Sequence, residues 1–245
     1  MIWETLPNYD ALSQRAASIL LDGIRNDPRA ALGLPTGRTP IGMYDRVIAE
    51  CSRQYHCFRE VTTFNLDEYV GIPREHPGSY CAFMKQYLFA HVDLDPVRTH
   101  IPDGMAADPD AECARYERRI ATAGGLDLTF LGLGSNGHIA FNEPGTPFDS
   151  RTRVVALTPS TRQANESLFA GGDVPTRAIT MGIGTILESR RIVLLAGGKN
   201  KHDAIARLQS GQQSIEFPAS ALWSHDDVLV LVDRASSARG DRVAL

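Results

Sequence analysis

The chain has 245 residues, of which 43% are hydrophobic and 22% are charged, and its formal net charge is −4. This size and composition predict a single domain over residues 1–245, and the mildly acidic balance argues against a nucleic-acid partner. No apolar run reaches the roughly 20 residues of a membrane span, so we also expect no membrane partner.

Short apolar or β-branched runs alternate with helical patterns along the whole chain. The predicted strands cover residues 30–34, 61–66, 99–101, 128–131, 153–157, 178–181, 191–196 and 228–232. The predicted helices cover residues 10–24, 40–48, 80–92, 109–123, 159–169, 183–187 and 199–208. This alternation predicts an α/β fold, a three-layer α/β/α sandwich of Rossmann-like type with a mostly parallel sheet.

The strand at 30–34 runs into a loop that suits a phosphate group. Gly37, Arg38 and Thr39 stand just before Pro40, which can open the next helix. Backbone N–H groups and the helix dipole at such a junction attract anions, and Arg38 adds a positive charge. The alternative is an ordinary turn between strand and helix.

Two carboxylates follow the strand at 61–66. Asp67 and Glu68 are adjacent, and neighbouring side chains of an extended chain point to opposite sides, so only one of them can face a pocket. A solvated acidic turn is an equally good interpretation of this pair. A basic loop with Lys199 and Lys201 follows the strand at 191–196, where an anion site and two solvated lysines are both possible.

The apolar run at 128–131 leads into the most informative loop. Gly132, Gly134 and Gly137 match the spacing of a dinucleotide fingerprint, but prolines follow too closely for the helix that such a site needs, and the acid about 20 residues on is missing. His138 and Glu143 come directly after these glycines. A histidine can take and give a proton near neutral pH, and a nearby carboxylate can orient it by accepting a ring N–H.

These residues predict proton transfers on a phosphorylated metabolite. With them in view, the chain resembles the glucosamine-6-phosphate deaminase family from about residue 32 to residue 233. The matching motifs are LGLPTGRTP at 32–40, FNLDEYVG at 64–71, EHPGSY at 75–80, LGLGSNGHIAFNEPG at 131–145, SRTRVVALTPSTRQAN at 150–165 and AITMGIGTIL at 178–187. Several long motifs in the same order make the resemblance specific.

The resemblance implies conversion of glucosamine 6-phosphate and water to fructose 6-phosphate and ammonia, without a metal or another cofactor. Asp67 would move a proton from C2 to C1 of the sugar, and His138 would open the sugar ring with the support of Glu143. The loop Gly37–Arg38–Thr39 and Lys201 would hold the phosphate. The implied partner is a small-molecule sugar phosphate.

Three positions depart from the long, allosteric members of the family. Asn136 stands where those members have an ionisable Asp, so it can only orient His138 by hydrogen bonding. Val155 stands at the position of a Lys, and Ser167 at that of a phosphate-contacting Arg. We therefore expect a short, non-allosteric protein that is a monomer or a small homo-oligomer.

Other interpretations remain open at this point. Galactosamine 6-phosphate would use the same machinery, and the sequence does not identify which hydroxyl orientation is recognised. A 6-phosphogluconolactonase of the same fold is less compatible with the motifs at 64–71 and 142–145. A sugar-phosphate sensor would need a DNA-binding helix pair for which one domain leaves no room.

The four cysteines lack the spacing of a metal or disulfide site, and the N-terminus lacks a signal peptide, so we expect a cytoplasmic protein.

Overall fold

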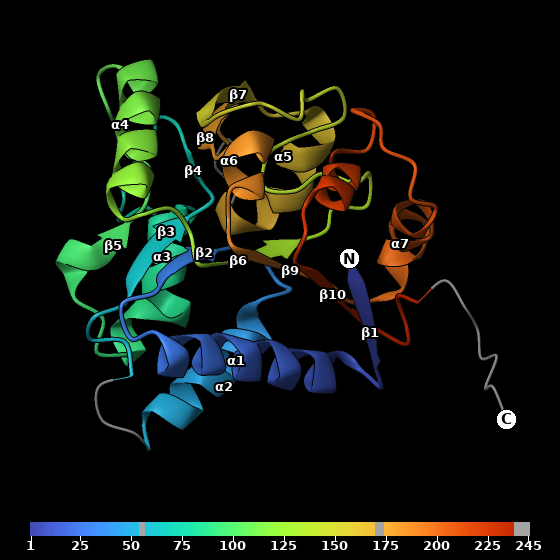
Figure 1. Cartoon of the computed structure of the whole chain (residues 1–245). Coiled ribbons are helices and arrows are strands. Elements are labelled where there is room, and N and C mark those ends of the chain that lie inside the picture. The colour runs from blue at the N-terminus through green and yellow to red at the C-terminus, as the bar shows by residue number, and fades with distance from the viewer. Residues whose placement is uncertain (54–56, 170–173, 238–245) are drawn as a thin grey trace, which may run out of the picture.

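Seven parallel strands form the main sheet. In the computed structural model, which describes residues 1–53, 57–169 and 174–237, they lie in the order β1-β10-β9-β6-β2-β3-β5 (Figure 1). Every neighbouring pair is parallel, which confirms the predicted sheet. The strands are β1 Ile2–Leu6, β2 Ala31–Leu34, β3 Thr62–Asn65, β5 Thr99–His100, β6 Leu128–Gly132, β9 Arg191–Ala196 and β10 Val228–Asp233.

The strand order reverses between β2 and β6. From β2 the chain runs outward through β3 to β5, and it then returns to the other side of β2 with β6, β9 and β10. In open α/β sheets, ligands bind outside the carboxyl ends of the strands at such a reversal. The loops that follow β2 and β6 are therefore the expected position of a ligand site.

Helices cover both faces of the sheet and complete the three predicted layers. Helices α1 and α2 lie below the sheet in Figure 1, and α4, α6 and α7 lie above it. Helix α3 packs into the same core as α1 and α2. The helices are α1 Tyr9–Asn26, α2 Ile41–Cys51, α3 Tyr80–Tyr87, α4 Pro109–Thr122, α5 Pro159–Asn165, α6 Ile183–Leu187 and α7 His202–Gln209.

Strand periodicity explains why both faces are apolar. In β9, Val193 and Leu195 point into the core shared with α1 and α2. Ile192, Leu194 and Ala196 point into the opposite core, beneath α4, α6 and α7. Successive side chains of a strand alternate between faces, so a parallel strand covered on both sides is apolar throughout.

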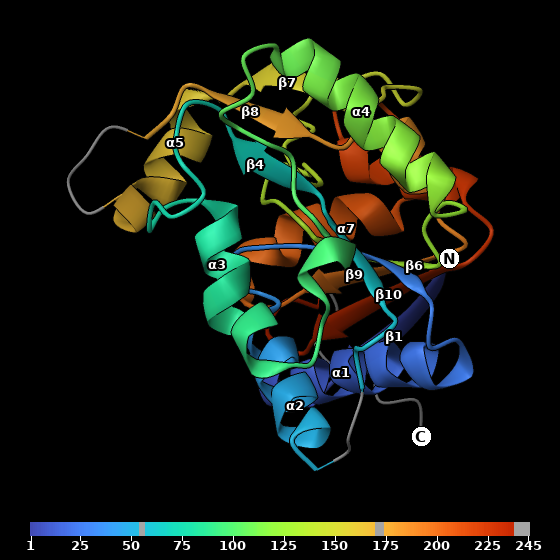
Figure 2. The same cartoon turned by 90° about the vertical axis from the view of Figure 1, so that its left-hand side faces the viewer.

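A second sheet, which the sequence did not predict, lies beside the first. Strand β8 (Arg177–Thr180) pairs antiparallel with both β4 (Asp67–Tyr69) and β7 (Arg153–Ala156), and Figure 2 shows the three side by side. The expectation that 153–157 and 178–181 belong to one mostly parallel sheet was wrong. Residues 153–155 of β7 are only partly buried, which antiparallel sheets tolerate and parallel sheets rarely do.

Several local predictions can also be compared with the structure. Side chains cap the N-termini of two helices: in α3 Ser79 accepts from the Ala82 N–H, and in α4 Asp108 accepts from the N–H groups of Asp110 and Ala111. Strand β1 was not predicted. The expected helices at 80–92 and 199–208 are each divided between an α-helix and a short 3₁₀ segment. The 3₁₀ segments are η1 Phe89–His91, η2 Pro96–Arg98, η3 Glu166–Phe169, η4 Lys199–Lys201 and η5 Pro218–Ser224.

None of the helices in the described ranges is long and apolar enough to cross a bilayer.

Candidate active site

The sequence-predicted residues follow four neighbouring strands at one edge of the main sheet. Strands β9, β6, β2 and β3 are adjacent and parallel, so their carboxyl ends share this edge. Lys201 follows β9, His138 follows β6, Gly37 follows β2, and Asp67 follows β3. The two loops nearest the reversal of strand order are those that carry Gly37 and His138.

The loop after β2 has the features of an anion site. Gly37 has a φ of 90°, a left-handed conformation that favours glycine. The following helix α2 has no acidic residue in its first turn and no side-chain cap, so its N-terminus retains its positive dipole. The guanidinium of Arg38 is exposed. Tyr9, which the sequence did not single out, fixes the loop: its hydroxyl donates to the carbonyl of Thr39 at 2.9 Å and accepts the Gly42 N–H at 3.0 Å.

Lys201 is a partly buried cation close to the imidazole. It ends the 3₁₀ segment η4, whose preceding residue, Gly198, has a φ of 91°. Burial lowers the pKa of Lys201, and the charge of Lys201 contributes to a lowered pKa of His138. Within the described ranges no carboxylate forms an ion pair with Lys201, so its charge is available to an anionic ligand.

The two carboxylates of β4 have opposite environments, as their alternation predicted. Glu68 accepts three backbone N–H groups, from Tyr69 at 2.8 Å and from Tyr80 and Cys81 at 2.9 Å each. Asp67 is only 6% exposed, and in the described part of the chain no donor bonds to its carboxylate. Burial, and then the charge of Glu68, raise the pKa of Asp67 well above its usual range. The alternative of a solvated acidic turn is therefore wrong.

Asn136 connects His138 to Glu143, which corrects the expected direct contact. The Nδ1 atom of His138 lies 3.8 Å from Glu143 Oε2, too far for a hydrogen bond, but 2.8 Å from Asn136 Oδ1. The Asn136 amide nitrogen donates to Glu143 Oε2 at 2.7 Å, and Glu143 Oε1 also accepts from the Thr161 hydroxyl.

This relay fixes the tautomer of the imidazole. An ionised carboxylate only accepts hydrogen bonds, so the NH₂ group of Asn136 must face Glu143 and its oxygen must face His138. The His138 Nδ1 therefore carries the proton, which leaves the Nε2 lone pair free. Burial lowers the pKa of His138, and Lys201 lowers it too, whereas Glu143 raises it. The net lowering favours a neutral imidazole at neutral pH.

Close backbone packing holds the loop after β6 in shape. A Cβ atom at Gly134 would lie 2.4 Å from the His138 ring, and one at Gly137 would lie 2.1 Å from the Phe217 ring. Ala140 has a φ of 51°, an uncommon conformation for a residue other than glycine. Asn142 is fully buried, and its side chain donates to the carbonyls of Ile139 at 3.0 Å and of Met181 at 2.9 Å.

Strand β8 connects the two halves of the site. Asp67 pairs with Thr180 in the second sheet, and the Thr180 hydroxyl accepts the Phe141 N–H at 3.1 Å. The next residue, Met181, donates its N–H to the carbonyl of Leu66 at 2.7 Å. The loop after β2 lies against the same assembly: burial raises the pKa of Tyr80, whose ring packs on Tyr69, and the Thr36 side chain is close enough to its hydroxyl to lower that pKa in part. The carboxylate and the imidazole are therefore at the same end of the sheet.

Two cavities lie elsewhere and contain none of these residues. One, of about 300 Å³, is lined by residues at the amino ends of β2, β6 and β9, and includes the ion pair of Arg190 and Asp127. The other, of about 510 Å³, is a shallow groove beside β5. The carboxyl edge remains the better candidate because it combines a buried base, an oriented imidazole and an anion loop.

Comparisons with known proteins identify the family of this chain. A family model described as glucosamine-6-phosphate isomerases/6-phosphogluconolactonase matches residues 8–231. The chain belongs to this family. A glucosamine-6-phosphate deaminase of Bacillus velezensis is 50% identical over 238 residues, which cover 97% of this chain and 98% of that relative.

Solved structures of the family divide into a similar and a distant group. A monomeric glucosamine-6-phosphate deaminase superposes with a TM-score of 0.94 at 48% identity, covering 98% of this chain and all of that one. A 6-phosphogluconolactonase from Trypanosoma cruzi has a TM-score of 0.77 at 20% identity, over 96% and 95% of the two chains, which shows a shared fold alone.

Some residues around the site were not predicted, and one expectation falls outside the structure. Thr161, Arg153 and Tyr9 carry no catalytic chemistry of their own, so only their contacts reveal them. Val155 packs partly buried against the apolar cluster of the second sheet, as a valine should. The side chain of Ser167 lies outside the part of the chain that the structure describes.

Proposed function

We propose that this protein is a glucosamine-6-phosphate deaminase, which converts glucosamine 6-phosphate and water to fructose 6-phosphate and ammonia. One observation carries the proposal: a buried carboxylate without a hydrogen-bond donor among the described residues, Asp67, is tied through β8 to the loop that carries an oriented imidazole, His138. The names and similarity of the relatives support the same activity.

The phosphate of the substrate would bind at the edge between β2 and β9. Backbone N–H groups of Gly37, Arg38 and Thr39 and the α2 dipole would face it, and Lys201 would supply a charge-assisted hydrogen bond. A phosphate fixed there orients the rest of the sugar toward the loop after β6. Binding energy from this remote group would position the reacting carbons.

Ring opening would use His138. Its neutral Nε2 takes the proton of the anomeric hydroxyl, and the imidazolium that forms is stabilised through Asn136 by the negative charge of Glu143. The imidazolium then gives the proton to the ring oxygen, and the bond between C1 and the ring oxygen breaks. The products of this step are the open-chain aldehyde and a neutral imidazole ready for another cycle.

Isomerisation and deamination would use Asp67. Its carboxylate takes the C2 proton, the electron pair forms a C1–C2 double bond, and the aldehyde oxygen takes a proton from the ammonium group on C2, which gives a neutral enolamine. Asp67 then returns its proton to C1, which leaves a protonated imine at C2. Water adds to C2 and ammonia departs, giving the ketose. The raised pKa of Asp67 suits a base that must abstract a proton from carbon.

Ammonia release by the wild type and by Asp67→Asn tests the proposal. We expect the wild type to release ammonia from glucosamine 6-phosphate, and the variant to lose roughly 10²- to 10⁴-fold in kcat with a similar KM. Galactosamine 6-phosphate and 6-phosphogluconolactone are assayed in parallel. Faster turnover of either would replace the proposed substrate, and unchanged kcat in the variant would remove Asp67 from the mechanism.

We further propose a cytoplasmic, non-allosteric enzyme that is a monomer or a small homo-oligomer, without a metal or another cofactor. Val155 supports the absence of allosteric activation, since effector-binding members of the family have a lysine at this position. Saturation curves with and without N-acetylglucosamine 6-phosphate should be hyperbolic and superimposable. A sigmoidal curve that the effector makes hyperbolic would contradict the proposal.

A further inference from the structure

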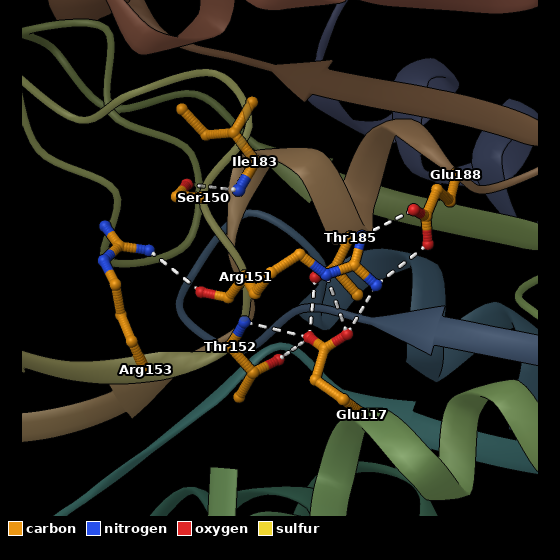
Figure 3. Close-up of polar contacts among 8 residues, drawn as sticks. All are labelled: Glu117, Ser150, Arg151, Thr152, Arg153, Ile183, Thr185 and Glu188. Carbon is orange, nitrogen blue, oxygen red and sulfur yellow. Dashed lines mark hydrogen bonds and ion pairs between the residues drawn. The ribbon is translucent and has the colours of Figure 1, made fainter. Parts of the chain in front are cut away.

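One carboxylate outside the proposed site gathers five hydrogen bonds, and Figure 3 shows how they converge. Glu117 of α4 accepts at Oε1 from the Thr152 N–H at 2.9 Å, the Thr152 hydroxyl at 2.5 Å and the Thr185 hydroxyl at 2.7 Å. Its Oε2 accepts from Arg151 Nε at 3.1 Å and Nη2 at 2.6 Å. Burial raises the pKa of Glu117, but these bonds together outweigh burial and lower it, so the carboxylate is ionised at neutral pH.

The network fixes the turn that precedes β7. Ser150, the first residue of this turn, accepts the Ile183 N–H with its hydroxyl at 3.0 Å and the Gly184 N–H with its carbonyl at 2.9 Å. A Cβ atom at Gly182 would lie 2.1 Å from the Ser150 oxygen, so the backbone of α6 packs directly on the turn. Helix α4, the turn and α6 are therefore held together around one charge.

The turn sets the position of Arg153, which is the first residue of β7. Arg153 Nη1 donates to Asn142 Oδ1 at 2.9 Å, and Asn142 in turn donates to the Ile139 carbonyl, beside His138. The same Arg153 pairs with Thr180, whose other strand partner is Asp67. One residue thus contacts both the loop that carries the imidazole and the strand that aligns the base.

The turn helps to position Arg153, which has no carboxylate partner among the residues that the structure describes. Its guanidinium is partly buried, and in the described part of the chain no ion pair forms with it; burial lowers its pKa. Its remaining bonds are long, at 3.4 Å to the Arg151 carbonyl and to the Thr146 hydroxyl. The backbone that leads into Arg153 is fixed at Thr152, whose N–H donates to Glu117.

We propose that Glu117 is a positioning residue for the deaminase reaction: it fixes the turn at 150–152 so that Arg153 holds the loop of His138 and the strand of Asp67 in register. This inference rests on the proposed function for its kinetic consequence. Its structural consequence, a defined environment for His138, is independent of the reaction.

The test compares Glu117→Gln with Glu188→Gln. Glu188 also pairs with Arg151, at 2.5 Å, but its side chain is 64% exposed, and among the described residues its carboxylate bonds to neither Thr152 nor Thr185. Glu117→Gln should lower kcat roughly 10- to 100-fold, because small displacements of reacting groups have effects of this size. KM should change by less than about threefold, and Glu188→Gln should match the wild type.

A second measurement does not require activity. In an NMR titration of the histidine rings, the pKa of His138 should rise toward its ordinary value in Glu117→Gln, because a displaced loop admits water, and should stay unchanged in Glu188→Gln. Thr185→Val, which removes a single bond, should give smaller changes in the same directions and replaces Glu117→Gln if that variant does not fold.

The outcomes separate the two proposals. If the wild type releases no ammonia, the proposed function fails, and the titration still tests Glu117. If the wild type is active, wild-type kcat and an unshifted His138 in Glu117→Gln overturn the positioning role. Equal losses in Glu117→Gln and Glu188→Gln would also overturn it, because they would trace the effect to Arg151 alone.

Discussion

Asp67→Asn should stabilise the folded protein while it lowers kcat by roughly 10²- to 10⁴-fold. The wild-type carboxylate is 6% exposed, has the like charge of Glu68 beside it, and receives no hydrogen bond from the described residues. A buried polar group without a partner costs about 1–3 kcal/mol, and a charged one costs more. Asparagine has nearly the same shape without the charge, so we expect a gain of about 1–3 kcal/mol at neutral pH.

The raised pKa of Asp67 also predicts how the stability difference between the variant and the wild type depends on pH. The folded-state pKa of Asp67 is raised above its unfolded value, so the native state binds more protons over the interval between the two values. The stability associated with the protonated form is fully present below the unfolded pKa and is lost as the pH rises through the folded pKa. The advantage of the Asn variant should therefore be small in acid and grow as the pH rises toward neutrality.

Thermal unfolding followed by circular dichroism at several pH values measures the effect. For a chain of this size the expected gain corresponds to a rise in Tm of roughly 2–12 °C. Glu68→Gln is the matched control: it is equally buried, but its amide would point an N–H at the Cys81 N–H, so it should lower Tm. A lower Tm for Asp67→Asn, or a gain that does not depend on pH, would refute the reasoning.

Three further substitutions test the groups around the imidazole. Glu143→Gln should lower the pKa of His138 further in an NMR titration, because the Glu143 charge raises it; an unchanged pKa would remove Glu143 from the relay. Lys201→Met should raise KM roughly 10-fold or more through the lost phosphate contact, and should raise the pKa of His138; an unaltered KM in steady-state kinetics would contradict this role. Gly134→Ala should lower kcat roughly 10-fold or more, because its Cβ would overlap the His138 ring, whereas Gly132→Ala, with open space, should not; equal kcat values would argue against a fixed imidazole.

The central strands of the main sheet were predictable because they are buried on both faces, whereas β1, which is exposed or only partly buried, was not predicted. Runs such as those at 191–196 and 228–232 are apolar at every position, and helical patterns separate them. The second sheet was not predictable in the same way. Its strands are short, and the pairing of Asp67 with Thr180 joins residues more than a hundred positions apart, which no local pattern encodes.

The candidate site was only partly predictable for a related reason. Chemically distinctive residues just after predicted strands, such as His138 and Asp67, are visible in the sequence. The hydrogen bond between Asn136 and His138 was expected, but the expected direct contact of Glu143 with His138 was wrong, because sequence spacing does not distinguish a contact of 2.8 Å from one of 3.8 Å. Glu117 was missed entirely, since a helical glutamate normally belongs to a solvated face, and only its five converging donors set it apart.

The contacts of β4 explain how a base can be both unpaired and well placed. Hydrogen bonds that position a carboxylate also occupy its oxygens, which leaves the group less able to take a proton. Here the neighbouring Glu68 makes the bonds, three of them to backbone N–H groups, and Thr180 supplies the strand register. Asp67 is thus held through its backbone while its oxygens stay free for a substrate proton.

Arg153 is held in a similar way. The turn that Glu117 fixes constrains the backbone that leads into Arg153, and the guanidinium can bond with Asn142. In both cases a neighbour with many hydrogen bonds keeps a poorly paired group in place.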